Sequence, residues 1–422
     1  MAITRILATP DPAAAAAAHN GSDRLGVALF HAGEPRLPGL GASLPMQFRK
    51  QLPQPVPQLA WDFLSIALAA FAADRFVLRS DGDDGWTRVL DVTIAVQNPA
   101  TWTQVGPQLA AALRFLTGDI WSLRFIAGGG QPIAFQGDLI HDRDTVCLFS
   151  GGLDSLLGAL SLLDQGGRPK LISQASQKEV TPQKYLANHL GLLEHRLNAN
   201  VYERWRPPYE GSTRGRSLIF FAYGVAAAAA LNLPEVLVPE NGLIAINPPL
   251  TPRRLGSLST RTTHPHLLSE LNDILSEVGL DVRLRNPFEG MTKGAMLAQS
   301  NHPKLAYLAG LSYSCGKGKR KNGQCGRCVP CLIRRASFHA SRVPDQTAPY
   351  KDKIELSRRN DDVMAARLAV AKASRLDDAA FERWVRQSGP LPADAIRRMT
   401  IVSAVKDGLG ELSSYLGTIP WR

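Results

Sequence analysis

The chain has 422 residues, of which 45% are hydrophobic and 20% are charged, and its formal net charge is +11. This composition excludes a fibrous or disordered protein, and the length favours two or three structural units. The positive charge suits an acidic ligand such as a nucleotide, and nucleic acid is a less favoured partner because only residues 316–321 form a dense basic cluster.

The sequence favours a cytoplasmic protein without membrane association. The longest apolar run, 219–231, is shorter than the roughly 20 residues that cross a bilayer, and we expect it to form a buried helix. Residues 1–21 lack the cationic start and long apolar run of a secretion signal.

Residues 1–140 are predicted to form a small α+β domain whose role the sequence does not disclose. Short β-like runs alternate with helical stretches, at 24–30, 58–76, 88–96, 106–119 and 120–127. The alanine run 13–18 is expected to be a linker or a short helix.

Residues 141–343 are predicted to form a doubly wound α/β domain, and residues 344–422 a helical extension. A strand at 145–149, a glycine turn, a helix at 155–166 and a strand at 169–176 make a βαβ unit, which implies a parallel sheet. Further predicted elements are a helix at 184–197, a strand at 199–204, a helix at 217–231, a strand at 235–240, a helix at 266–278 and a strand at 281–287. Ligands of such sheets bind beyond the carboxyl ends of the strands.

The turn after the first of these strands reads SGGLDS, from Ser150 to Ser155. Gly151 and Gly152 let the backbone bend tightly and expose its N–H groups, and the next helix directs the positive end of its dipole to the same place. This arrangement indicates a phosphate cradle. Ser150 and Ser155 can add hydroxyl donors, and Asp154 can hold Mg²⁺ or order the loop. The alternative is a turn that only joins strand to helix.

The hexapeptide differs from the Walker loop, GxxxxGK[ST]. It resembles the PP-loop pattern SGGxDS of the N-type ATP pyrophosphatases, which have an adenine nucleotide alpha hydrolase-like fold. The resemblance implies that ATP is split between its α- and β-phosphates, with adenylation of a substrate and release of pyrophosphate. It implies that residues 150–155, Leu153 included, bind ATP together with Ala175, near which the backbone would read the adenine.

Four of the five cysteines cluster late in the chain, Cys315, Cys325, Cys328 and Cys331, whereas Cys147 stands alone. Without a secretion signal, this clustering favours a metal over disulfides. A CxxCxxC knuckle with one further cysteine supplies the four thiolates of a structural zinc site, which leaves no open coordination position. An iron–sulfur cluster, which also takes four cysteines, is the alternative.

The two motifs, in this order and separation, resemble the QueC family of 7-cyano-7-deazaguanine synthases over about residues 144–340. The agreement continues in GRSLIFFAYGVA at 215–226, PENG at 239–242, NPFEGMTKGAM at 286–296 and CGRCVPCLIRRASF at 325–338. The resemblance implies an ATP-dependent, AMP-forming ligase that makes a C–N bond after adenylating a 7-deazaguanine carboxylate.

The resemblance also implies residue roles in catalysis. Asp154 and the rest of the 150–155 segment would bind the pyrophosphate group, while Arg216 and Lys293 would neutralise phosphate charge as it shifts to the leaving group. The plainer interpretation of the two cations is a solvated surface charge.

Four further residues are candidates for substrate binding. Glu240 and Asn241 could face a guanine-like edge, or they could only stabilise a turn. Arg261 and His264 could grip a carboxylate or contact a partner, and a structural role is the alternative for His264.

Residues 1–140, the helical extension and the segment 247–265 depart from the ordinary synthase. They are similar to the QatC branch of QueC-like proteins encoded in bacterial anti-phage operons. That similarity implies an amide or nitrile-type product, and conjugation of the deazapurine to a protein partner from the same operon in place of ammonia.

Two other functions stay open. A tRNA-thiolating PP-loop enzyme would suit the basic charge, but it commonly needs a reactive thiol, and Cys147 lies in a predicted buried strand. A non-catalytic nucleotide-binding subunit of a defence complex would keep the loop without turnover.

Overall fold

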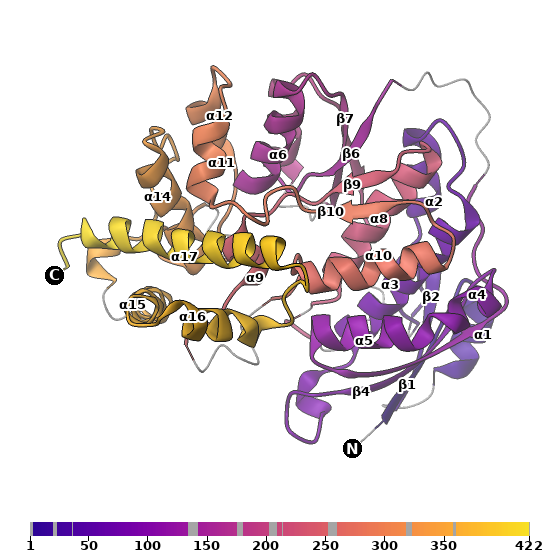
Figure 1. Ribbon diagram of the computed structural model, residues 1–422. Coiled ribbons are helices and arrows are strands. Elements are labelled where there is room, and N and C mark those ends of the chain that lie inside the picture. Colours follow the sequence, from indigo (N-terminus) through magenta and orange to yellow (C-terminus); the bar gives the residue numbers. More distant parts are fainter. Residues whose placement is uncertain are drawn as a thin grey trace. The chain divides into compact units, whose positions relative to one another are not determined.

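The computed structural model describes residues 3–19, 23–35, 37–133, 142–174, 180–201, 209–212, 214–251, 260–317, 323–357 and 360–421. The chain divides into two compact units, whose elements are labelled in Figure 1. The first unit comprises Met1–Val146, His195–Val236 and Leu267–Leu284, and the second comprises Cys147–Glu194, Leu237–His266 and Arg285–Arg422. Among the described residues, none of the helices combines the length and apolar character that a membrane span requires.

The first unit contains a five-stranded sheet in the order β3-β2-β1-β4-β5. Its strands are β1 (Ile3–Thr9), β2 (Arg24–His31), β3 (Gly39–Gly41), β4 (Val89–Ala95) and β5 (Ile120–Ile126). All the pairings between them are parallel, so the predicted α+β class of residues 1–140 is wrong and the class is α/β. The sequence interpretation missed β1, which is the central strand and pairs with both β2 and β4.

The helices of this unit explain the parallel order, because they return the chain to the same edge of the sheet between strands. Those between its strands are α1 (Pro12–Ala18), α2 (Leu44–Gln51), α3 (Gln58–Phe76), α4 (Pro99–Gln104) and α5 (Gly106–Thr117), with a 3-10 turn η1 (Arg79–Asp81). The unit also contains α8 (Arg216–Ala230) and most of α10 (Pro265–Glu277). Helix α3 packs against both β4 and α8, and a helix covered on two sides is apolar around its circumference. Nearly all of its side chains are buried.

Four buried charges form an ion-pair network inside the first unit. Arg88 Nη2 lies 2.7 Å from Asp74 Oδ1 and 2.6 Å from Asp119 Oδ2, and Arg79 Nη1 lies 3.0 Å from Asp119 Oδ1. All four side chains are at most 3% exposed. Buried charges are tolerated when they are paired and hydrogen-bonded. Through Asp74, this network links α3 to the strands that follow it.

The second sheet has the order β10-β9-β6-β7-β8. Its strands are β6 (Thr145–Leu148), β7 (Pro169–Gln174), β8 (Glu194–Leu197), β9 (Glu235–Leu237) and β10 (Arg283–Arg285). The strand order reverses at β6, because β7 and β8 follow on one side and β9 and β10 on the other. In a parallel sheet, such a switch point places the ligand crevice at the loops that follow β6 and its neighbour β9.

One boundary differs from the sequence prediction. The helix expected at 184–197 is α7 (Val180–His189), and β8 begins only five residues later at Glu194. Gly191 has a φ of +66°, a left-handed conformation that ends helices. Residues 202–204 of the strand expected at 199–204 lie outside the described part of the chain, and Val201 forms an isolated antiparallel bridge with Leu40.

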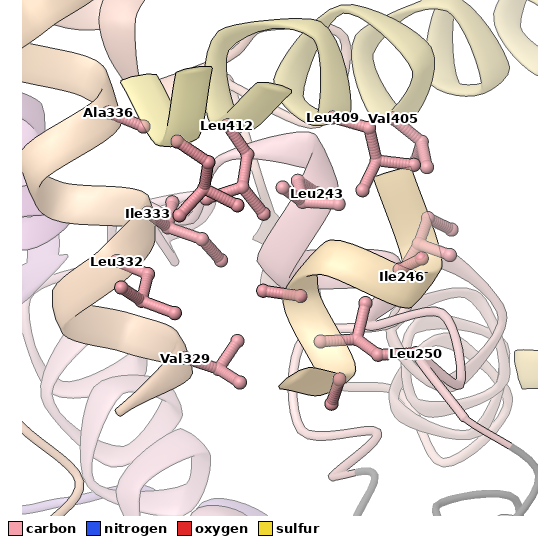
Figure 2. Close-up of a cluster of buried hydrophobic side chains, with 14 of the residues drawn as sticks. Leu243, Ile246, Leu250, Val329, Leu332, Ile333, Ala336, Val405, Leu409 and Leu412 are labelled. Atoms are coloured by element: carbon pink, nitrogen blue, oxygen red, sulfur yellow. The ribbon is translucent and has the colours of Figure 1, made fainter. Parts of the chain in front are cut away.

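The second unit is rich in helices. They are α6 (Leu153–Asp164), α7, α9 (Gly242–Ile246), α11 (Lys293–Gln299), α12 (Leu305–Leu311), α14 (Val329–Ser341), α15 (Asp361–Ala373), α16 (Asp378–Val385) and α17 (Ala395–Gly417), with 3-10 turns η3 (Ile354–Leu356) and η4 (Arg386–Ser388). Leu243 of α9, Ile333 of α14 and Leu409 of α17 belong to one buried hydrophobic cluster, drawn in Figure 2. The predicted helical extension therefore shares a core with the rest of its unit.

Candidate functional site

The 150–155 loop joins β6 to α6 in a tight bend. Gly151 has a φ of +77°, and Gly152 is the N-cap of α6. The hydroxyl of Ser150 accepts a hydrogen bond from the Gly152 N–H at 3.3 Å, and the hydroxyl of Ser155 donates to the Gly152 carbonyl at 3.0 Å. The Leu153 side chain is buried in the core, so only its backbone is available to a ligand.

Gln183 of α7 supports this loop, although no local sequence signal pointed to it. Its side-chain amide donates a hydrogen bond to the Ser150 carbonyl at 3.1 Å. A Cβ atom on Gly151 would lie 2.8 Å from Gln183 Cγ. Position 151 therefore needs glycine for two reasons, its left-handed backbone and the close approach of Gln183.

Replacing Gly151 by alanine is expected to destabilise the chain and to weaken ATP binding. Gly166→Ala is the matched control, because Gly166 has a φ of +78° but open space around its Cα. Both variants carry the left-handed cost of about 1–2 kcal/mol, and only Gly151→Ala adds an overpacking cost of about 1–3 kcal/mol.

Denaturant unfolding and ATP titration of both variants check this prediction. We expect ATP affinity to fall by about tenfold or more in Gly151→Ala and to stay unchanged in Gly166→Ala. Equal stability and equal affinity of the two variants would contradict the role of Gln183 as a support of the loop.

A cluster of charged and amide groups lies beside the loop. Lys293 Nζ, at the start of α11, lies 2.7 Å from Asp154 Oδ2. The Asn241 side-chain amide donates to Asp154 Oδ1 at 3.0 Å and approaches Glu240 Oε1 at 3.3 Å. The structure thus brings together the loop after β6, the turn after β9 and the first residue of α11.

The charge balance of this cluster is unequal, because two carboxyl groups face one ammonium group. Burial and the neighbouring Asp154 carboxylate raise the pKa of Glu240 well above its usual value, and the Lys293 ammonium only partly opposes them. The side chain of Lys293 is 3% exposed and that of Asp154 is 12% exposed. The arrangement therefore places the ion pair of Asp154 and Lys293 beside a carboxyl group, Glu240, whose raised pKa favours the protonated form.

The turn that carries Glu240 and Asn241 is fixed by its own hydrogen bonds. Asn286 accepts from the Glu240 N–H at 3.1 Å and donates to the Glu240 carbonyl at 2.8 Å. Asn241 Oδ1 accepts from the Ile244 N–H at 3.2 Å and so caps α9. Asn241 consequently has a turn-stabilising role and a contact with Asp154 at the same time.

The remaining predicted site residues lie elsewhere. Arg216 is the first residue of α8 in the first unit. Ala175 lies outside the described residues, as do residues 252–259 of the predicted segment 247–265. Arg261 is partly buried, and burial lowers its pKa.

His264 is fully buried in the second unit. Its Nδ1 accepts a hydrogen bond from the His266 N–H at 3.2 Å. Burial, with the nearby charges of His266 and Arg261, lowers the pKa of His264 to about 3, so the ring is neutral at physiological pH. This environment fits a structural role.

The four clustered cysteines form a group suited to a metal ion. Their Sγ atoms all lie within 4.8 Å of one another, and all four residues are buried. Cys315 Sγ lies 3.8 Å from Cys328 Sγ, and Cys325 Sγ lies 4.0 Å from Cys331 Sγ. A tetrahedron of thiolates around zinc has sulfur atoms about 3.8 Å apart. The donor set and its spacing therefore fit structural zinc.

The backbone around these cysteines has the shape of a knuckle. Gly326 has a φ of +82°, and a Cβ atom there would meet Tyr350 Cβ at 2.8 Å. The N–H of Cys328 donates to Cys325 Sγ at 3.3 Å, and Cys328 is the N-cap of α14. The cysteine group thus connects the loop before α14 to the first turn of that helix.

Comparisons with known proteins agree with these features. Residues 263–342 match the family described as queuosine biosynthesis protein QueC. A 7-cyano-7-deazaguanine synthase from Paracoccus denitrificans is 25% identical over 233 residues, which cover 49% of this chain and 93% of the relative. One from Desulfatibacillum aliphaticivorans is 22% identical over 49% of this chain and 97% of the relative. One from Saccharolobus solfataricus is 28% identical over 46% of this chain and 45% of the relative.

These relatives are similar to about half of this chain at low identity. The matched family segment contains Lys293 and all four clustered cysteines. The similarity is thus to enzymes named for 7-deazaguanine chemistry, and it includes two of the features described above.

Proposed function

We propose that this chain is an ATP-dependent enzyme that adenylates a 7-deazaguanine carboxylate and releases pyrophosphate. The contact between Asp154 and Lys293 carries the proposal, because it brings opposite charges to a glycine loop at the strand-order reversal. The similarity of half the chain to 7-cyano-7-deazaguanine synthases supplies the substrate class.

In the proposed reaction, a carboxylate oxygen of the substrate attacks the α-phosphorus of ATP. The bond from that phosphorus to the bridging oxygen breaks, and pyrophosphate leaves with the electron pair. An amine then attacks the acyl carbon and loses a proton, and AMP leaves, which gives an amide; a nitrile-type product forms only when the amine is ammonia, because only a primary amide can then lose water. The backbone N–H groups of the 150–155 loop would bind the leaving phosphates.

The cluster of Asp154, Glu240 and Lys293 suits the negative charge that develops on the leaving phosphates during this reaction. When ATP binds with Mg²⁺, the oxygens of Asp154 and Glu240 are the hard ligands that this ion prefers. Lys293 is then free to pair with phosphate oxygens in place of Asp154, and Arg216 is the second cation proposed for this role. The ion pair seen in the structure would thus be a resting arrangement.

We propose a protein amine as the acceptor, as in the QatC branch of anti-phage proteins. The support is that roughly half of the chain lies beyond the similarity to the synthases. A partner protein from the same operon would supply the amine, and Arg261 would contribute to binding of the carboxylate.

The alternatives have less support. Burial raises the pKa of the Cys147 thiol to about 12, and a protonated buried thiol is a poor sulfur carrier. The other four cysteines are grouped at metal-binding distances. A tRNA-thiolating enzyme is therefore disfavoured. A non-catalytic nucleotide-binding subunit differs from the proposed enzyme in having no turnover, so a measurement of turnover distinguishes the two.

Pyrophosphate release is the direct test. We expect ATP, Mg²⁺ and a 7-deazaguanine carboxylate together to give pyrophosphate and AMP, and Lys293→Met to reduce the rate by about 10²-fold or more. Mass spectrometry of the neighbouring gene products, co-expressed with this chain, would detect a deazaguanine adduct on the acceptor. Absence of pyrophosphate with the wild-type chain and all candidate partners would leave the non-catalytic subunit as the function.

A further inference from the structure

Helix α17 of the C-terminal extension packs closely against the segments that carry Lys293 and Asn241. Three glycines in these segments, Gly242, Gly290 and Gly294, lie so near to α17 that a Cβ atom on any of them would come within 3.0 Å of it. On α17 they would meet atoms of Ala404, Thr400 and Glu411, respectively, and a Cβ atom on Gly242 would also meet the Glu289 carbonyl oxygen. Arg397 at the start of α17 adds an ion pair to Glu289 at 2.6 Å.

Glu411 makes the most specific of these contacts. Its carboxylate accepts hydrogen bonds from the Thr292 hydroxyl and from the Gly294 N–H, the latter at 3.3 Å. Thr292 Oγ1 in turn accepts from the Ala295 N–H at 2.9 Å and caps α11. Glu411 therefore binds the residues on both sides of Lys293.

The surroundings of Glu411 show which groups control its charge. Burial raises its pKa, and the Asp407 carboxylate acts in the same direction. The Thr292 and Gly294 donors and the Lys293 ammonium oppose this rise. The hydrogen bonds to residues 292 and 294 thus favour the ionised form that accepts from both.

We infer that Glu411 is a positioning residue, which fixes Thr292 and Gly294 so that the Lys293 ammonium stays against Asp154. Lys293 has a buried, flexible side chain. The position of the first turn of α11 determines whether its ammonium group reaches Asp154. The C-terminal extension then contributes to the geometry of the candidate site. The positioning itself does not depend on the reaction, whereas its effect on turnover rests on the proposed function.

The test compares three full-length variants. Glu411→Ala removes both acceptor atoms, and Thr292→Val removes the hydroxyl while keeping the side-chain shape. Asp407→Asn is the matched control, because it removes an exposed carboxylate one turn earlier on α17 that accepts from Ser403; loss of this charge lowers the pKa of Glu411 and so keeps the ionised form that accepts from residues 292 and 294. Should Glu411→Ala fail to fold, Glu411→Gln keeps the side-chain volume and one acceptor oxygen, so it breaks one of the two hydrogen bonds to residues 292 and 294.

The first readout is independent of any enzymatic activity. We expect amine-directed labelling of Lys293 and hydrogen exchange in residues 292–296 to be at least about tenfold faster in Glu411→Ala, an effect of about 1.4 kcal/mol on local opening. Asp407→Asn should behave like the wild type. The Glu411→Ala/Thr292→Val double variant should match the faster single variant, because both changes break one hydrogen-bonded unit.

The second readout is pyrophosphate release. A positioning role predicts a lower kcat in Glu411→Ala with the KM for ATP little changed, and recovery of the rate in Thr292→Ser, which keeps the hydroxyl. Wild-type labelling and exchange rates in Glu411→Ala, or equal acceleration in Asp407→Asn, would overturn the inference. If the wild type releases no pyrophosphate, the proposed function fails and the labelling result still decides the positioning role.

Discussion

Replacing Asp154 by asparagine is expected to lower pyrophosphate release by about 10²–10³-fold. The substitution keeps the shape of the side chain and an oxygen that can accept from Asn241, but it removes the charge that pairs with Lys293 and would bind Mg²⁺. Steady-state pyrophosphate release checks this, with Asp164→Asn as the control, since Asp164 lies at the opposite end of α6. Undiminished turnover in Asp154→Asn would contradict the catalytic assignment.

The fold is expected to survive this substitution. Breaking a buried ion pair usually costs about 3–5 kcal/mol because one charge is left without a partner. Here the negative charge of Asp154 contributes to the raised pKa of Glu240. Once that charge is removed, the pKa of Glu240 falls, and Glu240 can ionise and balance Lys293. A circular dichroism melt should therefore show a loss much smaller than the usual cost, and a fully unfolded variant would contradict this charge exchange.

Removing the zinc is expected to have the largest effect on stability. Structural zinc contributes about 10–16 kcal/mol to the folding of small zinc domains. A chelator, or Cys328→Ser, should expose residues 312–317 and 323–331 to hydrogen exchange before the rest of the chain melts. The loss should spread into the hydrophobic cluster of Figure 2, because α14 starts at this site and contributes Ile333 to that cluster.

Cys147→Ala provides the control for this experiment. Cys147 is buried in β6, away from the four-cysteine group, so its loss should leave one zinc per chain in elemental analysis. An unchanged melting profile after complete metal removal would contradict a structural site. A visible charge-transfer absorption in the purified protein would instead indicate an iron–sulfur cluster.

The features that the sequence predicted correctly are local ones. The strand, glycine turn and helix around residues 145–164 follow from adjacent residues, and so does the spacing of the clustered cysteines. The bend at Gly151 and the approach of the four Sγ atoms are therefore present as expected. The pairing of Lys293 with Asp154 had no such local signal, since only the resemblance to a known family suggested that both residues belong to one site.

The missed features depend on contacts between distant segments. Strand β1 has no special composition, and its importance comes from the two neighbours with which it pairs. Gln183 and Asn286 support the loop and the turn from other elements. Glu411 reaches Thr292 across more than a hundred residues. Sequence periodicity describes the face of one element, and it does not disclose which partner that face will meet.

The close packing of α17 also has an evolutionary consequence. A C-terminal helix of this kind cannot be added to a simpler chain by gene fusion alone, because side chains at positions 242, 290 and 294 would block it. Small residues at those positions and a matching α17 surface must arise together. Substitutions at Gly290 and Gly294 and at the facing positions 400 and 411 should therefore be inherited as pairs. Loss of the extension should release these two glycines to vary, whereas the Glu289 carbonyl still constrains Gly242.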